Sequence, residues 1–157
     1  MPEPYEEILE GETHLRIAPN SRHEQICATL HKKFAASLVG VSSSKLLPPR
    51  SIVQLSPGTL VRPDLALVTT ANNRLWLAAE IINSGDHRLD TVIKKSIYEE
   101  TRVPRLWIID PRYDNVEVYH SSPYGLALQQ ILATREVLLE KLLPALQIEV
   151  SDLFKSN

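Results

Sequence analysis

The 157-residue chain has a single cysteine, so no disulfide can form within it, and we expect a reducing compartment such as the cytoplasm. It has no apolar run long enough to span a membrane, and its acidic start lacks the basic residues of a signal peptide. The histidines show no zinc-ligand spacing. A net charge of −2 neither demands nor excludes a nucleic-acid partner.

The composition, 43% hydrophobic and 23% charged residues, is typical of a globular protein, and we expect one domain over residues 1–157. Residues 1–10 are expected to be a helical or irregular lead-in, and residues 42–50, with two prolines, a loop. Apolar periodicity predicts two helices and a series of strands. The helices are expected over 23–38 and 88–101, and the strands over 12–17, 52–55, 60–68, 75–82, 103–109, 115–119, 126–132 and 146–150. This order favours an α/β (α+β) fold, a mixed sheet flanked by helices with a parallel crossover around the second helix.

Two acidic residues lie inside apolar strands. Asp64 stands in Val-Arg-Pro-Asp-Leu-Ala-Leu-Val, and Glu80 in Leu-Ala-Ala-Glu-Ile-Ile. A carboxylate buried in a strand is costly unless a metal or a base compensates it. If the strands are adjacent, the two acids meet and offer the oxygen ligands that Mg²⁺ prefers, and Lys94 on the next helix could stabilise developing charge. The pattern therefore predicts a metal-dependent hydrolytic site.

These segments also resemble the Uma-type restriction endonuclease family, which belongs to the PD-(D/E)XK nuclease superfamily. The likeness extends to Asp90…Lys94…Tyr98, Val-Pro-Arg-Leu-Trp-Ile-Ile-Asp-Pro, Tyr-Glu-Glu-Ile-Leu-Glu-Gly-Glu and Pro-Asn-Ser-Arg-His-Glu, so it covers most of residues 5–120. The resemblance implies a restriction-endonuclease-like fold and a Mg²⁺-dependent endonuclease acting on DNA, with Mn²⁺ as a substitute ion.

The resemblance also implies a ligand set. Asp64 and Glu80 would hold Mg²⁺ together with the carbonyl of Ile81, and Glu12 would be a further acid facing the same ion. The superfamily usually has a lysine two residues after the second acid, where this chain has Ile82.

In the family that lysine is moved onto the following helix, and Lys94 matches it. His23, Asp90 and Tyr98 are candidates for side chains that support the ligands. The family's Ser-Pro-Ser-like turn is replaced by Asn83-Ser84-Gly85, which keeps turn-forming residues but puts a serine contact to the site in doubt.

We expect the DNA to be bound by basic residues near the site, namely Arg62, Arg74 and Lys95, with affinity falling as salt rises. A homodimer is expected by analogy, because two related sites suit a two-stranded duplex.

Other interpretations remain open at this stage. Asp64 could be a turn acid at a strand edge, Glu12 a solvated strand acid, and His23 a helix-start residue. Lys94 could be a solvated lysine paired with Asp90. The whole chain could be a catalytically degenerate nuclease-fold module that serves in binding or assembly, or a hydrolase for another phosphate ester.

Overall fold

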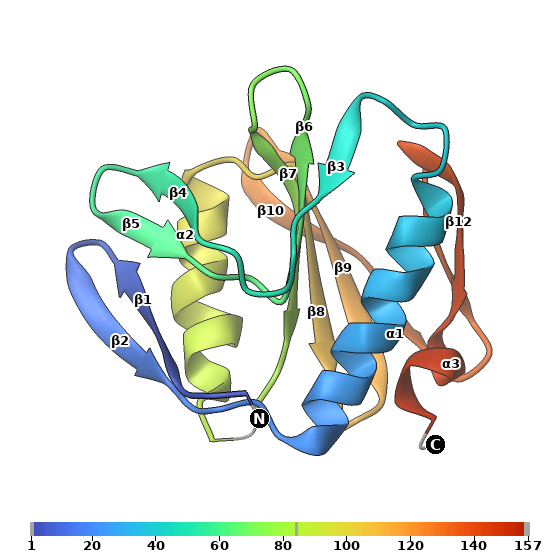
Figure 1. Ribbon diagram of the computed structural model, residues 1–157, viewed down its shortest axis with the longest axis horizontal. Helices are drawn as coiled ribbons and strands as arrows, with labels where there is room; N and C mark the ends of the chain where they lie inside the picture. The colour runs from blue at the N-terminus through green and yellow to red at the C-terminus, as the bar shows by residue number, and fades with distance from the viewer. Residues whose placement is uncertain (1, 84, 156–157) are drawn as a thin grey trace.

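A six-stranded mixed sheet forms the centre of the molecule (Figure 1). The computed structural model describes residues 2–83 and 85–155. Strands β7 and β8 run parallel and the other neighbouring pairs run antiparallel. The strands, in spatial order, are β10 (Gly125–Ala133), β9 (Asn115–Ser122), β8 (Arg105–Asp110), β7 (Leu75–Ile81), β6 (Leu65–Thr69) and β3 (Ser44–Leu46).

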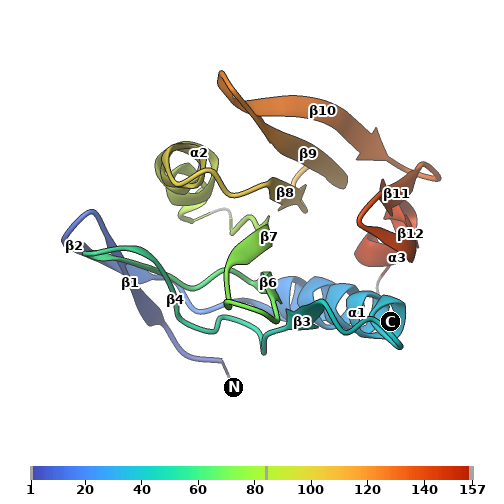
Figure 2. The same cartoon turned by 90° about the horizontal axis from the view of Figure 1, so that it is seen from above.

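Different elements cover the two faces of this sheet (Figure 2). One face packs against α1 (Ser21–Ser37), the two-stranded sheet of β11 (Val137–Glu140) and β12 (Leu143–Glu149), and α3 (Val150–Phe154). The other face packs against a π-helical turn, η1 (Leu89–Lys94), continued by α2 (Lys95–Glu100), and against a four-stranded sheet. That smaller sheet has the order β2 (Glu12–Arg16), β1 (Tyr5–Leu9), β5 (Thr59–Val61) and β4 (Val53–Ser56).

Local sequence explains the elements that carry the candidate site. Asn20 caps α1, because its side-chain oxygen accepts a hydrogen bond from the His23 backbone N–H at 2.8 Å. The helix then buries one stripe, with Phe34 against Trp107 at a ring-centroid distance of 5.3 Å. All seven residues of β7 are buried, as its nearly continuous apolar sequence predicts for a central strand. The helix η1–α2 connects β7 to the parallel strand β8, so the predicted crossover is confirmed.

Some predicted elements are wrong. The expected lead-in over 1–10 contains β1, which pairs with β2, and the expected loop over 42–50 contains β3. The strand expected over 60–68 is two strands, because Pro63 lacks the N–H that a continuous ladder needs, and β5 and β6 join different sheets. Strand β11 was not predicted. No helix among the described residues is long and apolar enough to cross a membrane.

Strand β2 directs the side chain of Arg16 toward the interior. Leu15 is 68% exposed, whereas Arg16 is 3% exposed. Strand β1 alternates in the same sense, so Glu7 is buried while Glu6 faces solvent. The hairpin therefore presents a buried acid and a buried base to η1, and this positions part of the site.

Candidate active site

Strands β6 and β7 bring the two strand acids together. Their antiparallel register pairs Leu65 with Ala79, and one step further along the same register sets Asp64 opposite Glu80. Both carboxylates are buried, and the Asp64 Oδ2 atom accepts a hydrogen bond from the Ile81 backbone N–H at 2.8 Å. Asp64 is therefore fixed against the end of β7, one residue from Glu80.

Lys94 projects from η1 into this pair and is completely buried. Its Nζ atom forms ion pairs with the Oε2 atom of Glu80 and, at 2.8 Å, with Oε2 of Glu7. The Oδ1 atom of Asp90 lies 3.9 Å from the same nitrogen. The Tyr98 hydroxyl, one helical turn further on, donates to Glu80 Oε2 at 2.6 Å. Lys94 is thus not a solvated surface lysine, and its ammonium lies directly beside the second strand acid.

The first hairpin contributes two residues that the sequence did not single out, Glu7 and Arg16. The Arg16 guanidinium bridges Glu7, Asp86 and Asp90, with Nε 2.8 Å from Asp86 Oδ2 and NH2 2.9 Å from Asp90 Oδ2. Glu7 also accepts from the Arg62 backbone N–H at 2.6 Å.

Glu12 is not part of this cluster. Its side chain is 82% exposed and lies 3.6 Å from His14, at the turn end of the β1–β2 hairpin. The early acid that does approach the site is Glu7, in the middle of β1. The sequence indicates Glu7 only if residues 5–9 are treated as a strand, because Tyr5, Glu7 and Leu9 then lie on the same face.

Basic groups engage Asp64 from the α1 side. His23 Nε2 lies 3.4 Å from Asp64 Oδ2 and 3.1 Å from the Ile81 carbonyl oxygen, so His23 faces the site. Arg50 NH1 lies 3.3 Å from Asp64 Oδ1. His31 Nε2 lies 2.7 Å from the Asp64 carbonyl oxygen. Asp64 is thus a buried acid held by basic groups and not a solvent-exposed turn acid.

The electrostatics of the cluster reflect crowding of buried acids. Burial and the negative charges of Glu7 and Asp64 raise the pKa of Glu80 against the lowering effect of Lys94. Burial and then Glu80 raise the pKa of Asp90 to about 8. The buried acids of the cluster are Glu7, Asp64, Glu80 and Asp90, and its buried bases are Arg16, His23 and Lys94. Glu80 shares the Lys94 ammonium with Glu7, so its negative charge is incompletely compensated.

The pKa of Asp64, in contrast, is lowered. Burial alone would raise it, but the hydrogen bond and charge of His23 and the Ile81 N–H hold it below its ordinary value. Burial would lower the pKa of His23, but Asp64 raises it. The His23–Asp64 pair therefore favours the imidazolium and the carboxylate.

The residues predicted to bind DNA lie apart from the paired acids. The Arg62 guanidinium lies 5.1 Å from the Tyr5 ring centroid and donates to the Arg50 carbonyl. Arg74 is exposed at the opposite end of the β6–β7 hairpin, and Lys95 lies 4.4 Å over the Tyr119 ring.

The turn after Glu80 is only partly described, since Ser84 lies outside the described residues. Asp86 closes the turn by donating its backbone N–H to the Asn83 carbonyl at 3.0 Å. Gly85 lies so close to Ile17 that an added Cβ would come within 2.4 Å of its Cδ1 atom. A larger residue at position 85 would displace Ile17.

A mixed sheet flanked by helices, with buried acids and a lysine at the end of its central strands, is a restriction-endonuclease-like α+β fold. The sequence profile of the Uma2 family, described as "Putative restriction endonuclease", matches residues 2–151, and the chain belongs to that family. A similar solved structure is that of "a putative nuclease belonging to DUF820" from Anabaena variabilis. It has a TM-score of 0.77 and 15% sequence identity, with 97% of this chain and 90% of that one covered. No curated protein matches the chain.

Proposed function

We propose that this protein is a Mg²⁺-dependent endonuclease that hydrolyses phosphodiester bonds in DNA. Membership of the Uma2 family supports nuclease activity. The observation that carries the proposal is the buried pair of Asp64 and Glu80 at the end of β7, with the Lys94 ammonium in contact with Glu80. Phosphodiester hydrolysis needs this combination of a cation site and a positive group near the developing charge.

The donor set fits Mg²⁺. The ion prefers carboxylate and carbonyl oxygens and keeps several waters, and Asp64, Glu80 and the Ile81 carbonyl would hold it. Among the described residues, no group of three or more histidine, cysteine or acidic side chains is arranged as a ligand set, so waters would complete the coordination. Burial and the charges of Glu7 and Asp64 raise the pKa of Glu80 despite Lys94, and this incompletely compensated charge also favours a cation. When bound, Mg²⁺ or Mn²⁺ would polarise the phosphate and make a water more acidic.

The chain's own residues divide the remaining work. Lys94 stabilises negative charge that develops on the phosphate, a role typically worth about 2–4 kcal/mol of barrier. The Tyr98 hydroxyl fixes Glu80 by a hydrogen bond. The Nε2 atom of His23 contacts both the Asp64 carboxylate and the Ile81 carbonyl and so fixes their relative positions.

Cleavage of supercoiled plasmid DNA tests this proposal. The wild type should produce nicked and linear DNA in Mg²⁺ or Mn²⁺ and none in EDTA, and Glu80→Gln should lose at least about 100-fold in rate. Glu12→Gln is the matched control, because Glu12 is exposed and contacts only His14 among the ion pairs described. Cleavage by Glu80→Gln at the Glu12→Gln rate would refute the assignment.

One observation favours a second candidate, a nuclease-fold module without catalysis that serves in binding or assembly. Both acids are already engaged by bases of this chain, Asp64 by Arg50 and His23, and Glu80 by Lys94. A protein whose acids are neutralised internally needs no metal.

Thermal unfolding with and without Mg²⁺ separates the two candidates. A bound ion at one hundred times its Kd stabilises the fold by about 2.7 kcal/mol. The nuclease predicts a Mg²⁺-dependent rise in Tm for the wild type that disappears in Glu80→Gln. No shift, together with no cleavage, identifies the module.

We further propose that residues 1–157 act as one domain, in the cytoplasm and as a homodimer, so that two sites meet the two strands of a duplex. Size-exclusion chromatography with light scattering tests the dimer, and a mass of one chain would refute it.

A further inference from the structure

We propose that a cavity beside His23 binds a backbone phosphate of the DNA, adjacent to the phosphate that is cleaved. The cavity has a volume of about 190 Å³ and is lined by Asn20, Arg22, His23, Ile82, Pro111 and Arg112. This inference rests on the proposed nuclease function and places the substrate on a surface that the sequence did not indicate.

The cavity adjoins the candidate active site. His23 is a common wall, because it lines the cavity while its Nε2 atom contacts Asp64 and the Ile81 carbonyl. Ile82, the residue after Ile81, lines the cavity as well. The candidate acids are themselves almost inaccessible, with Asp64 and Glu80 at 3% and 2% exposure. A strand that approaches them from this side must pass over the cavity.

The chemistry of the walls suits a phosphate. Arg22 and Arg112 are exposed arginines, and guanidinium groups match phosphate oxygens in geometry and charge. The first turn of the 17-residue helix α1 supplies Asn20, Arg22 and His23, so backbone dipoles add to the positive field.

Each arginine also has an acidic partner, and the two pairs differ. Arg112 bonds both Asp110 oxygens, at 3.0 and 2.9 Å, which fixes the guanidinium at the rim. Arg22 meets Asp114 at 2.6 Å in a pair whose side chains are 49% and 58% exposed. A solvent-exposed pair is weak, so a phosphate can replace Asp114 as the partner of Arg22. Asp114 therefore competes with the substrate.

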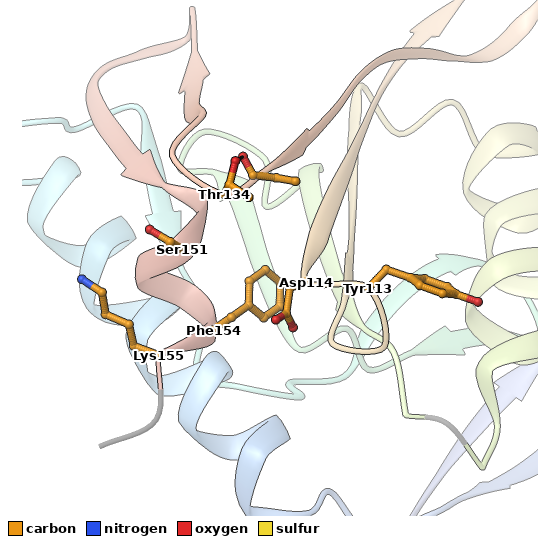
Figure 3. A pocket seen from close by; sticks show the side chains of 7 residues that line it. Tyr113, Asp114, Thr134, Ser151, Phe154 and Lys155 are labelled. Carbon is orange, nitrogen blue, oxygen red and sulfur yellow. Dashed lines mark hydrogen bonds between the residues drawn. The ribbon is translucent and has the colours of Figure 1, made fainter.

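Asp114 also lines a second cavity of about 280 Å³, which α3 and the 113–114 turn help to form (Figure 3). In that view Asp114 lies beside Phe154, while Tyr113 points away from it. Tyr113 is 70% exposed, and the Arg112 guanidinium lies 5.3 Å from its ring centroid. An exposed aromatic next to an arginine is a surface on which an unpaired base can stack.

Fluorescence anisotropy with a labelled DNA duplex tests the subsite without any cleavage. All variants carry Glu80→Gln and are measured in EDTA. Arg22→Gln and Arg112→Gln should each raise Kd roughly three- to tenfold. Each should reduce the slope of log Kd against log salt by about 0.9, the value for one lost phosphate contact. Lys141→Gln removes the same charge from the exposed turn between β11 and β12 and should leave both quantities unchanged.

Asp114→Asn gives the opposite expectation. It frees Arg22, so Kd should fall, and the gain should vanish when Arg22→Gln is added. The subsite is overturned if both arginine variants bind like Lys141→Gln, or if Asp114→Asn weakens binding. If only the subsite is wrong, the wild type still cleaves plasmid DNA. If only the nuclease proposal is wrong, the wild type does not cleave, but the differences in Kd between the variants remain. Absence of DNA binding by every variant overturns both.

Discussion

Replacing Lys94 with methionine tests the buried charge cluster directly. Methionine has a similar length and no charge, so the change leaves Glu7 and Glu80 without the ammonium that now contacts both. Lys94 and Glu7 are fully buried, and Glu80 is nearly so, which means that water cannot replace the lost partner. Removing one member of a buried ion pair costs about 3–5 kcal/mol.

For a chain of this size, 1 kcal/mol shifts Tm by about 2–4 °C, so Lys94→Met should lower Tm by roughly 6–20 °C at pH 7. Lys95→Met is the matched control. Lys95 is the next residue and is half-buried over the Tyr119 ring, a contact worth about 0.5–1 kcal/mol. Circular dichroism melts of the two variants give the comparison.

The pH dependence of the same variant is a second measurement. Without Lys94, the carboxylates of Glu7 and Glu80 have folded pKa values above their unfolded ones. Their protonated forms favour the folded state, so the variant loses stability as the pH rises through those pKa values. The deficit of Lys94→Met relative to the wild type should therefore shrink between pH 8 and pH 5. A deficit equal to that of Lys95→Met, or one that grows in acid, would refute the account of the cluster.

Three further substitutions test other residues of the buried charge cluster. Tyr98→Phe removes the hydroxyl that donates to Glu80 at 2.6 Å and should cost about 1–3 kcal/mol in urea unfolding, with reduced cleavage. Burial and Glu80 raise the pKa of Asp90 to about 8, so its contribution to stability is complete below about pH 4 and is lost as the pH rises through 8. Asp90→Asn should thus gain on the wild type between pH 6 and pH 9 in thermal melts. Glu7→Gln removes one of the two carboxylates that contact the Lys94 ammonium and should cost about 3–5 kcal/mol in urea unfolding; a cost below about 1 kcal/mol would exclude a role for Glu7 in holding Lys94.

Sequence alone indicated the central sheet because its signals are local. The apolar run of β7, the crossover helix and the strand after it can be identified without knowing what they pack against. Asp64 and Glu80 were conspicuous for the same reason, since each is a charge within an apolar strand, whereas Lys94 was chosen from its place on the following helix and from the family resemblance.

Of the first hairpin only the strand over 12–17 was predicted, and its alternation is inverted in the structure. Leu15 faces solvent and Arg16 faces inward, which contradicts the rule that apolar residues mark the buried face. The arginine is stable inside only because Asp86, Asp90 and Glu7 surround it, and two of these lie more than 60 residues away. Glu12 was chosen over Glu7 because position in the motif, and not strand register, guided the choice.

The raised pKa of Glu80 connects folding to the proposed activity. A cluster built only for stability would match its acids and bases, since an uncompensated buried carboxylate costs more than an apolar replacement. Here Glu80 touches Lys94, yet its pKa is still raised, because Glu7 shares that lysine and Asp64 adds a further negative charge. A divalent cation at Asp64 and Glu80 would relieve this repulsion and leave Lys94 to Glu7 and the substrate. The raised pKa of Glu80 therefore supports the proposed cation site over a permanently neutralised core.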